Sequence, residues 1–441
     1  MRNDEKSFDG GVIRSRLRPM RLEVINTGTE LLLGNTINTH LAYLGEHLLP
    51  LGLRIGRQIC IPDGDIIREA LVESFSRQDI VIVTGGLGPT SDDLTRDFIA
   101  GLLGVELAVN EEALARISHF FTSRNRPMPE STKVQALVPR GAVVLMNAHG
   151  TAPGLILSVA AGKFREQATQ IVMLPGPPRE LRPMFTNQVV PWLGATLPVE
   201  SEFVCRTLKT TGLGESRVEE SIAPHLKHLT DTGLVLGYCA RVGEVDVRFV
   251  AQGCGAQQTV SEAEGITRRL IGEHVFGVDD DELEESVVRL LKEQKLTLAL
   301  AESCTGGFIA HRLTNVPGAS AVFWGGAVSY ANAAKEHVLG VNPATLAAHG
   351  AVSEETACEM AAGALRISGA DFALSVTGIA GPDGGTTEKP VGTVFIGLAS
   401  REGVTAKKFL NRFDRETFKY VTSQQALEMV RRSVLGLKLA L

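Results

Sequence analysis

The stretch AESCTGGFIAHRL places two candidate nucleophiles, Ser303 and Cys304, after an apolar run and before two glycines. The apolar run predicts a buried strand, and the periodic residues after Gly306 and Gly307 predict a helix that Thr305 can cap. Because the first N–H groups of a helix lack partners within it, such a turn can hold an oxyanion or a phosphate beside a nucleophile. This pattern predicts acyl chemistry. A plain strand–turn–helix junction is the alternative.

Two later apolar runs end in residues that can serve the same site. Tyr330 and Lys335 follow VFWGGAV; a lysine deprotonated by burial can take a serine proton, and a tyrosine hydroxyl can relay or orient it. Thr377 and Gly378 close FALSVTG, where N–H groups of a glycine-rich turn can cradle a phosphate. Each residue taken alone is better explained as a surface lysine, a packed ring or a glycine hairpin.

A second group of candidates lies in VTGGLGPTSDDLTRD, after the apolar run IVIV. Gly85, Gly86 and Gly88 allow the backbone to approach a phosphate closely, and Asp92 and Asp93 offer oxygen ligands to a hard divalent cation. The sequence predicts a pyrophosphate and metal site here. The alternative is that the two carboxylates only cap a helix and offset its dipole.

The elements around these residues predict two three-layer α/β domains joined by a small α+β module. From Arg21 onward, branched apolar runs alternate with helical stretches, which is typical of a parallel sheet buried on both faces by helical crossovers. The same alternation of apolar runs and helical stretches resumes after the acidic run DDDELEE. The predicted segments are a tail over 1–20, an α/β domain over 21–195, a connector over 196–278 and a second α/β domain over 282–441.

Composition narrows the class of function. The chain has 441 residues, a net charge of −6 and six cysteines without a CxxC pair. The charge argues against direct nucleic-acid binding, and no apolar run approaches the roughly 18 residues that a membrane span needs. The cysteines fit neither a zinc knuckle nor a disulfide framework, so we expect a cytoplasmic protein that acts on small molecules.

The C-terminal motifs resemble a known family. AESCTGG, GGAVSYANAAKEHVLGV, HGAVSEETACEMA, ADFALSVTGIAGPDGG and KPVGTVFIGLA, in this order, are similar to the CinA C-terminal family, the nicotinamide mononucleotide (NMN) deamidases also called PncC. The resemblance implies hydrolysis of NMN to nicotinate mononucleotide and ammonia, without a metal or other cofactor. The family's serine, tyrosine and lysine fall on Ser303, Tyr330 and Lys335.

Only this resemblance decides between the two nucleophiles, because a cysteine is intrinsically the better one. It assigns attack on the carboxamide to Ser303 and makes Cys304 a small buried neighbour. It also places Phe413 where the family usually has glycine, close to the arginine that contacts the ligand phosphate. The residues expected to bind the substrate are Thr305, Gly306, Gly307, Thr377, Gly378 and Arg415.

The N-terminal motifs resemble the molybdopterin-binding fold of the MoaB, MogA and MoeA proteins, and more closely the CinA N-terminal domain. They are GTELLLGNTINTHLAYLGEHL, GGLGPTSDDLTRD, NAHGTAPGL and LPGPPRELRPMF. The resemblance implies ADP-ribose pyrophosphatase activity with Mg²⁺, Mn²⁺ or Co²⁺ near Asp92 and Asp93. Glu30 and Thr95 match motif positions at the phosphate site, and Thr132 replaces the family's usual asparagine.

The connector resembles the KH-like module of full-length CinA proteins. KH modules bind RNA through a GxxG loop and positive charge, whereas this segment has GLG at 212–214 and more acidic than basic residues. We therefore expect a spacer or dimerisation element, and a homodimer that binds NMN and ADP-ribose. The competing hypothesis is a non-enzymatic protein in competence or DNA recombination, which would act through a protein partner.

Overall fold

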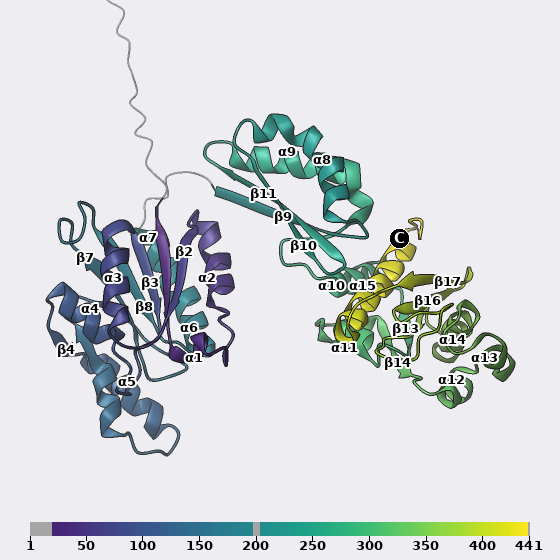
Figure 1. Ribbon diagram of the computed structural model, residues 1–441, viewed down its shortest axis with the longest axis horizontal. Coiled ribbons are helices and arrows are strands. Elements are labelled where there is room, and N and C mark those ends of the chain that lie inside the picture. The colour runs from purple at the N-terminus through teal and green to yellow at the C-terminus, as the bar shows by residue number, and fades with distance from the viewer. Residues whose placement is uncertain (1–19, 197–202, 440–441) are drawn as a thin grey trace, which may run out of the picture. The chain divides into compact units, whose positions relative to one another are not determined.

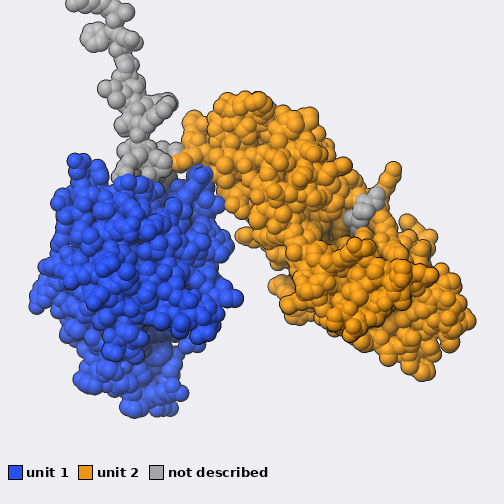
Figure 2. Space-filling model, viewed as in Figure 1, with its two compact units in different colours: residues 1–203 blue, residues 204–441 orange. Residues whose placement is uncertain are grey.

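The computed structural model describes residues 20–196 and 203–439, so the predicted tail over 1–20 lies outside the described residues apart from Met20. The chain forms two compact units, residues 1–203 and 204–441 (Figure 2). The first unit holds one α/β sheet, and the second holds a small antiparallel sheet and another α/β sheet. The predicted fold class is confirmed.

The first unit is built on a six-stranded sheet with the order β2-β1-β3-β8-β7-β6. β2, β1, β3 and β8 run parallel, whereas β7 and β6 run antiparallel to their neighbours. The strands are β1 (Leu22–Thr27), β2 (Ile55–Ile61), β3 (Ile80–Thr84), β6 (Val143–Leu145), β7 (Gly154–Val159) and β8 (Thr169–Leu174). A separate two-stranded sheet pairs β4 (Leu107–Val109) with β5 (Leu137–Pro139).

Helices cover both faces of the six-stranded sheet because β1 and β3 alternate their apolar side chains between two cores. One core packs Ile25 against α3 (Ile66–Arg77) and α4 (Thr95–Leu103), and the other packs Val24 against α2 (His40–Leu48). The remaining helical segments of this unit are α1 (Thr29–Leu32), η1 (Leu49–Leu51), α5 (Glu111–Thr122), η2 (Glu130–Ala136), α6 (Pro178–Met184), η3 (Phe185–Val189) and α7 (Val190–Thr196).

The KH-like part of the second unit is an antiparallel sheet with two helices on one face (Figure 1). The strand order is β10-β11-β9-β12. The strands are β9 (Phe203–Thr211), β10 (Val235–Arg241), β11 (Glu244–Gln252) and β12 (Val275–Val278), and the helical segments are α8 (Glu215–Thr230), α9 (Ala256–Ile271) and η4 (Gly272–His274).

The C-terminal part of this unit is a five-stranded sheet with the order β14-β13-β15-β16-β17. β14, β13 and β15 run parallel, and β16 and β17 continue antiparallel. The strands are β13 (Leu298–Glu302), β14 (Phe323–Val328), β15 (Phe372–Gly378), β16 (Thr393–Ser400) and β17 (Gly403–Leu410).

Side-chain size alternates along β13 and separates the two faces of this sheet. Leu298 and Leu300 meet α10 (Leu283–Gln294), α11 (Phe308–Asn315) and α15 (Arg415–Val434) on one face. Ala299 and Ala301 let α12 (Asn332–Leu339) and α14 (Glu354–Ser368) approach closely on the other. The shorter helical segments are η5 (Ala319–Ala321) and α13 (Pro343–His349).

The closing helix begins earlier than the apolar pattern suggests. We expect it near 418–437 from the sequence, but α15 starts at Arg415 because Asp414 caps it, accepting bonds from the N–H groups of Glu416 and Thr417. This cap places Arg415 in the first turn of the helix. Among residues 20–196 and 203–439, no helix has the length and apolar character that crossing a bilayer requires.

Candidate functional site

Three parallel strands of the C-terminal sheet bring the predicted catalytic residues to one edge. Ser303 follows β13 and its N–H donates to Val376 O of β15 at 2.9 Å. Ser329 follows β14 and its N–H donates to Glu302 O of β13 at 2.8 Å. Since the carboxyl ends of parallel strands meet at one edge, Ser303 and Tyr330 start from adjacent strand ends.

Lys335 lies in the first turn of α12 and reaches this edge from the side. Its side chain is only 1% exposed. Its Nζ donates to Ser303 Oγ at 3.1 Å, to Ser329 O at 2.8 Å and to Tyr330 O at 3.3 Å. Burial lowers the pKa of Lys335. The geometry therefore pairs a serine hydroxyl with an amine that sheds its proton more readily than a surface lysine does.

Cys304 is placed differently from Ser303, although the two are adjacent. Its side chain is 6% exposed and packs in the core with Leu300 and Ile309. Burial raises the pKa of the Cys304 thiol to about 12. Because the thiolate is the reactive form, this cysteine is not activated at neutral pH, and the geometry favours Ser303 as the nucleophile.

The turn after Ser303 differs from the sequence-based expectation. The helix α11 begins at Phe308 with Gly307 as its N-cap, and Thr305 makes no cap; its hydroxyl is buried without a partner among the described residues. The Glu302 carboxylate instead accepts bonds from the N–H groups of Gly307 at 3.0 Å, Ile309 at 3.1 Å and Ala310 at 2.8 Å. The prediction that this helix start offers free N–H groups was wrong.

Glu302 is the residue that sequence reasoning missed. It is buried at the end of an apolar strand, and a carboxylate in that position needs several donors. The acidic residue within the apolar run was the available signal. In the described parts of the chain, the turn N–H groups of Cys304 and Thr305 donate to no oxygen and are directed at the Cys304 sulfur, which is a weak acceptor.

Tyr330 and Arg415 form the open side of the site. The Tyr330 side chain is 60% exposed, and its hydroxyl accepts a bond from Arg415 Nη2 at 2.8 Å. Arg415 Nη1 donates to Gly381 O, in the loop after β15, at 2.8 Å. Tyr330 therefore meets Lys335 through its backbone carbonyl, while its hydroxyl is directed to the arginine.

The structure gives the Thr377–Gly378 turn a packing role. The Thr377 hydroxyl is buried and donates to Ala351 O at 2.7 Å. A Cβ at Gly378 would come within 2.8 Å of Thr393 O on β16, so glycine is needed where the two strands approach. Gly306 and Gly307 have positive φ of 64° and 93°, which permits the tight turn before α11.

The N-terminal glycines form a loop between β3 and α4 that packs closely on the protein itself. A Cβ at Gly85 would lie 2.5 Å from Thr27 O, and one at Gly86 would lie 2.1 Å from Thr95 Oγ1. A Cβ at Gly88 would lie 2.3 Å from Asp93 Oδ2. The structure thus brings the predicted glycines, Thr95 and Asp93 together at one strand end.

The two aspartates do not cap α4, whose N-cap is Leu94 without a side-chain bond. Asp93 Oδ2 accepts bonds from Thr90 N at 3.0 Å and Thr90 Oγ1 at 2.5 Å. Asp92 is exposed, and the Thr90 hydroxyl that donates to Asp93 is also close enough to Asp92 to lower the pKa of that carboxyl. Glu30 is folded back against Gly28, where a Cβ would lie 2.6 Å from Glu30 Oε1.

These residues fit a divalent cation only in part. Within the described residues, no group of three or more His, Cys, Asp or Glu side chains is arranged to hold a metal ion. Magnesium is commonly held by one or two carboxylates together with substrate phosphates and water. The donor set of Asp92 and Asp93 therefore fits a cation that arrives with a phosphate ligand, and does not fit one held by the protein alone.

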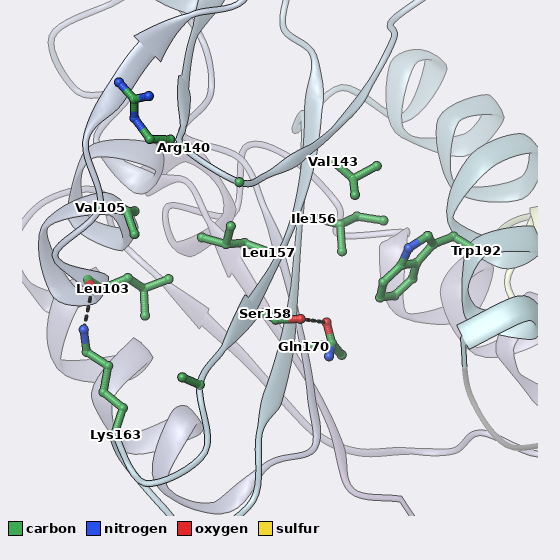
Figure 3. A pocket seen from close by; sticks show the side chains of 12 residues that line it. Leu103, Val105, Arg140, Val143, Ile156, Leu157, Ser158, Lys163, Gln170 and Trp192 are labelled. Carbon is green, nitrogen blue, oxygen red and sulfur yellow. Dashed lines mark hydrogen bonds between the residues drawn. The ribbon is translucent and has the colours of Figure 1, made fainter.

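A separate cavity of about 390 Å³ lies beside β7 in the first unit (Figure 3). Trp192 and Leu157 contribute apolar walls, and Lys163 closes one side by donating to Leu103 O at 2.5 Å. None of the predicted site residues lines it.

Comparison with known proteins covers all three parts of the chain. Residues 23–195 match the Probable molybdopterin binding domain, 205–277 the Damage-inducible protein CinA KH domain, and 280–434 the CinA C-terminal domain. The chain is 46% identical over 412 residues to a CinA-like protein of Akkermansia muciniphila, covering 93% of this chain and 97% of that protein. The chain belongs to the CinA family.

Solved structures that are similar to this chain each cover about a third of it. The competence/damage inducible protein CihA from Agrobacterium tumefaciens is 44% identical, covering 34% of this chain and 94% of that one, with a TM-score of 0.33. The protein CinA with unknown function from Thermoplasma acidophilum is 32% identical, covering 38% of this chain and 96% of that one, with a TM-score of 0.34.

Proposed function

We propose that the C-terminal α/β domain hydrolyses the carboxamide of NMN to nicotinate mononucleotide and ammonia. The observation that carries this proposal is the 3.1 Å contact between Lys335 Nζ and Ser303 Oγ, made by a lysine whose pKa is lowered by burial. A serine beside a neutral amine is a nucleophile and base pair for acyl transfer. The family resemblance supplies the substrate.

A neutral Lys335 amine can keep two of its three hydrogen bonds and reverse the direction of the third. A neutral amine has two hydrogens and one lone pair. The carbonyls of Ser329 and Tyr330 accept the two hydrogens, at 2.8 Å and 3.3 Å, which leaves the lone pair directed at Ser303 Oγ. In this state the Ser303 hydroxyl donates its proton to Lys335 Nζ while its oxygen attacks the carboxamide carbon.

The later steps of the reaction use Ser303, its turn and Lys335 again. The N–H groups of Cys304 and Thr305, which within the described residues are directed at the weakly accepting Cys304 sulfur and at no oxygen, would turn to the stronger acceptor and stabilise the oxyanion. The Lys335 ammonium then protonates the leaving nitrogen, so that the C–N bond breaks and ammonia departs. A water molecule gives a proton to Lys335 and attacks the acyl-enzyme, which releases nicotinate mononucleotide and restores the Ser303 hydroxyl.

The open side of the site suits the rest of NMN. The exposed ring of Tyr330 offers an aromatic face to the cationic pyridinium. Arg415 is already oriented by Tyr330 and Gly381, and its remaining N–H groups are available for the phosphate. The substrate would then be held at both ends while its carboxamide meets Ser303.

The direct test is ammonia release from NMN by the full chain, compared between wild type and S303A. We expect S303A to lose at least about a thousandfold in kcat, as for other serine nucleophiles. C304A is the matched control and should stay within about tenfold of wild type, because Cys304 packs in the core. Loss of activity in C304A with retention in S303A would reverse the assignment.

The N-terminal domain is our second candidate for catalysis, as a metal-dependent ADP-ribose pyrophosphatase that yields AMP and ribose 5-phosphate. The supporting observation is that Asp92 and Asp93 stand at the glycine loop without capping α4. A bound Mg²⁺, Mn²⁺ or Co²⁺ would neutralise phosphate charge and activate water. The glycine loop would position the pyrophosphate, and the family resemblance adds Glu30 and Thr95, although Thr95 is fully buried under Gly86 in this structure. ADP-ribose cleavage with each metal, by wild type and D92N, tests this.

The non-enzymatic alternative is a partner protein in competence or DNA recombination. The net charge of −6 disfavours direct DNA contact. Tight binding in a low-salt filter assay that weakens steeply with added salt would support this alternative over the enzyme. The expected homodimer is tested by light scattering, which would exclude it by giving the mass of one chain.

A further inference from the structure

The KH-like module and the C-terminal domain share a buried polar contact within the second unit. The turn between β10 and β11 lies against α15, where a Cβ at Gly243 would stand 3.6 Å from Gln424 Cβ. Beside it, Gln424 Nε2 donates to Glu244 Oε1. Glu244 is 2% exposed and Gln424 is 1% exposed. Both line a cavity of about 410 Å³ between the two modules.

Each of these two side chains also has a buried oxygen without a partner. Among the described residues, Glu244 Oε2 and Gln424 Oε1 have no hydrogen-bond donor. An ionised carboxylate only accepts hydrogen bonds, as does an amide oxygen, so neither can satisfy the other. Leaving such groups buried and unsatisfied is costly.

A single proton on Glu244 gives both of these unpaired oxygens a hydrogen-bond partner. The carboxyl O–H can then donate to Gln424 Oε1, while Gln424 Nε2 continues to donate to Glu244 Oε1. The two groups become a reciprocal acid–amide pair in which every polar atom of the contact has a partner. The same proton also removes an uncompensated charge from the interior.

The charges around Glu244 leave it without a cation of its own. Burial raises the pKa of Glu244, and the nearby Glu282 carboxylate adds to that rise. Lys209 and Arg312 favour the ionised form, but Lys209 pairs with Asp246 at 3.3 Å and Arg312 with Glu284 at 2.5 Å. Other titratable groups face this contact. They are Arg241, which pairs with Asp246, Glu428, which pairs with Arg431, Tyr420 of α15 and Glu215 of α8, which lines the same cavity.

We propose that Glu244 and Gln424 form a protonated acid–amide pair that fastens the KH-like module to α15, and that loss of this proton as pH rises loosens the contact. The helix α15 also carries Arg415 in its first turn, so the pair connects the KH-like module to the helix of the candidate site. This inference does not depend on NMN hydrolysis, because it concerns only groups at the contact between the modules.

The test compares thermal unfolding of the full-length wild type and E244Q between about pH 5 and about pH 8. A carboxyl whose pKa is raised on folding stabilises the fold fully below its ordinary value of 4.5, and this contribution is lost as pH rises through the raised pKa. The glutamine makes the reciprocal bonds at every pH. E244Q and wild type should therefore unfold at similar temperatures at the acidic end, and E244Q at the higher temperature at the alkaline end.

Two further variants test whether the pH dependence of unfolding comes from protonation of Glu244 or from packing at the contact. The double variant E244Q/Q424E moves the acid to α15 and should restore the pH dependence. E282Q keeps the pair and should retain the infrared band of a protonated carboxyl at the acidic end of this pH range, whereas E244Q should lose one such band. The proposal is overturned if wild type and E244Q change in parallel with pH, or if E244Q loses no protonated-carboxyl band.

Discussion

Replacement of Lys335 tests the proposed chemistry most directly. With its ordinary pKa of 10.5, about one amine in a thousand would be neutral at pH ~7.5, and each unit by which burial lowers that pKa raises the neutral fraction about tenfold. We therefore expect the kcat of wild type to rise with pH and to level off above the lowered pKa. General-base catalysis contributes roughly 100- to 10,000-fold, so K335M should lose about that much in kcat.

The same substitution should also lower stability. Removing the amine leaves the carbonyls of Ser329 and Tyr330 without the bonds that Lys335 gives them, at a cost of about 1–3 kcal/mol each. Ammonia release must therefore be measured well below the unfolding temperature of K335M, with the folded fraction checked by circular dichroism. K292M is the matched control, because Lys292 is an exposed lysine of α10 in the same domain, and its kcat should stay near wild type.

K335R distinguishes a base from a hydrogen-bond donor. Arginine retains the donors but does not deprotonate in proteins, so K335R should be about as inactive as K335M. The reasoning is refuted if K335R or K335M keeps a kcat within tenfold of wild type. It is refuted equally if the pH dependence of kcat is the same with and without the amine.

Three further outcomes follow from the contacts of the two sites. E302A should lower the free energy of unfolding by at least about 3 kcal/mol in urea titration, because three N–H groups at the start of α11 lose a charged acceptor; no change would contradict the capping role. R415A should raise the KM for NMN about 10- to 100-fold, while nicotinamide riboside, which lacks the phosphate, should be affected much less; equal effects on both would remove Arg415 from the phosphate site. Calorimetry should detect Mn²⁺ binding in the presence of ADP-ribose and little without it, and D92N should abolish that binding; tight binding of Mn²⁺ alone would contradict a site that needs the phosphate ligand, and unchanged binding in D92N would remove Asp92 from it.

The sequence determined the strands and the class of fold. Continuous apolar runs such as IVIV specify strands buried on both faces, and the alternation of leucine and alanine in β13 specifies which face admits the close-packed helices. The parallel order then brings strand ends together, so Ser303 and Tyr330 could be expected at one edge from the pattern alone.

The tertiary structure decided the chemical state of these residues. Whether Lys335 is an ordinary surface amine or a buried one depends on what α12 packs against, and its sequence neighbours do not encode this. The bonds from Glu302 to the start of α11 join groups five to eight residues apart through a turn whose path no local pattern predicts. Identities and periodicities are local properties of the chain, whereas burial, pKa and hydrogen-bond partners depend on the elements that fold around each side chain.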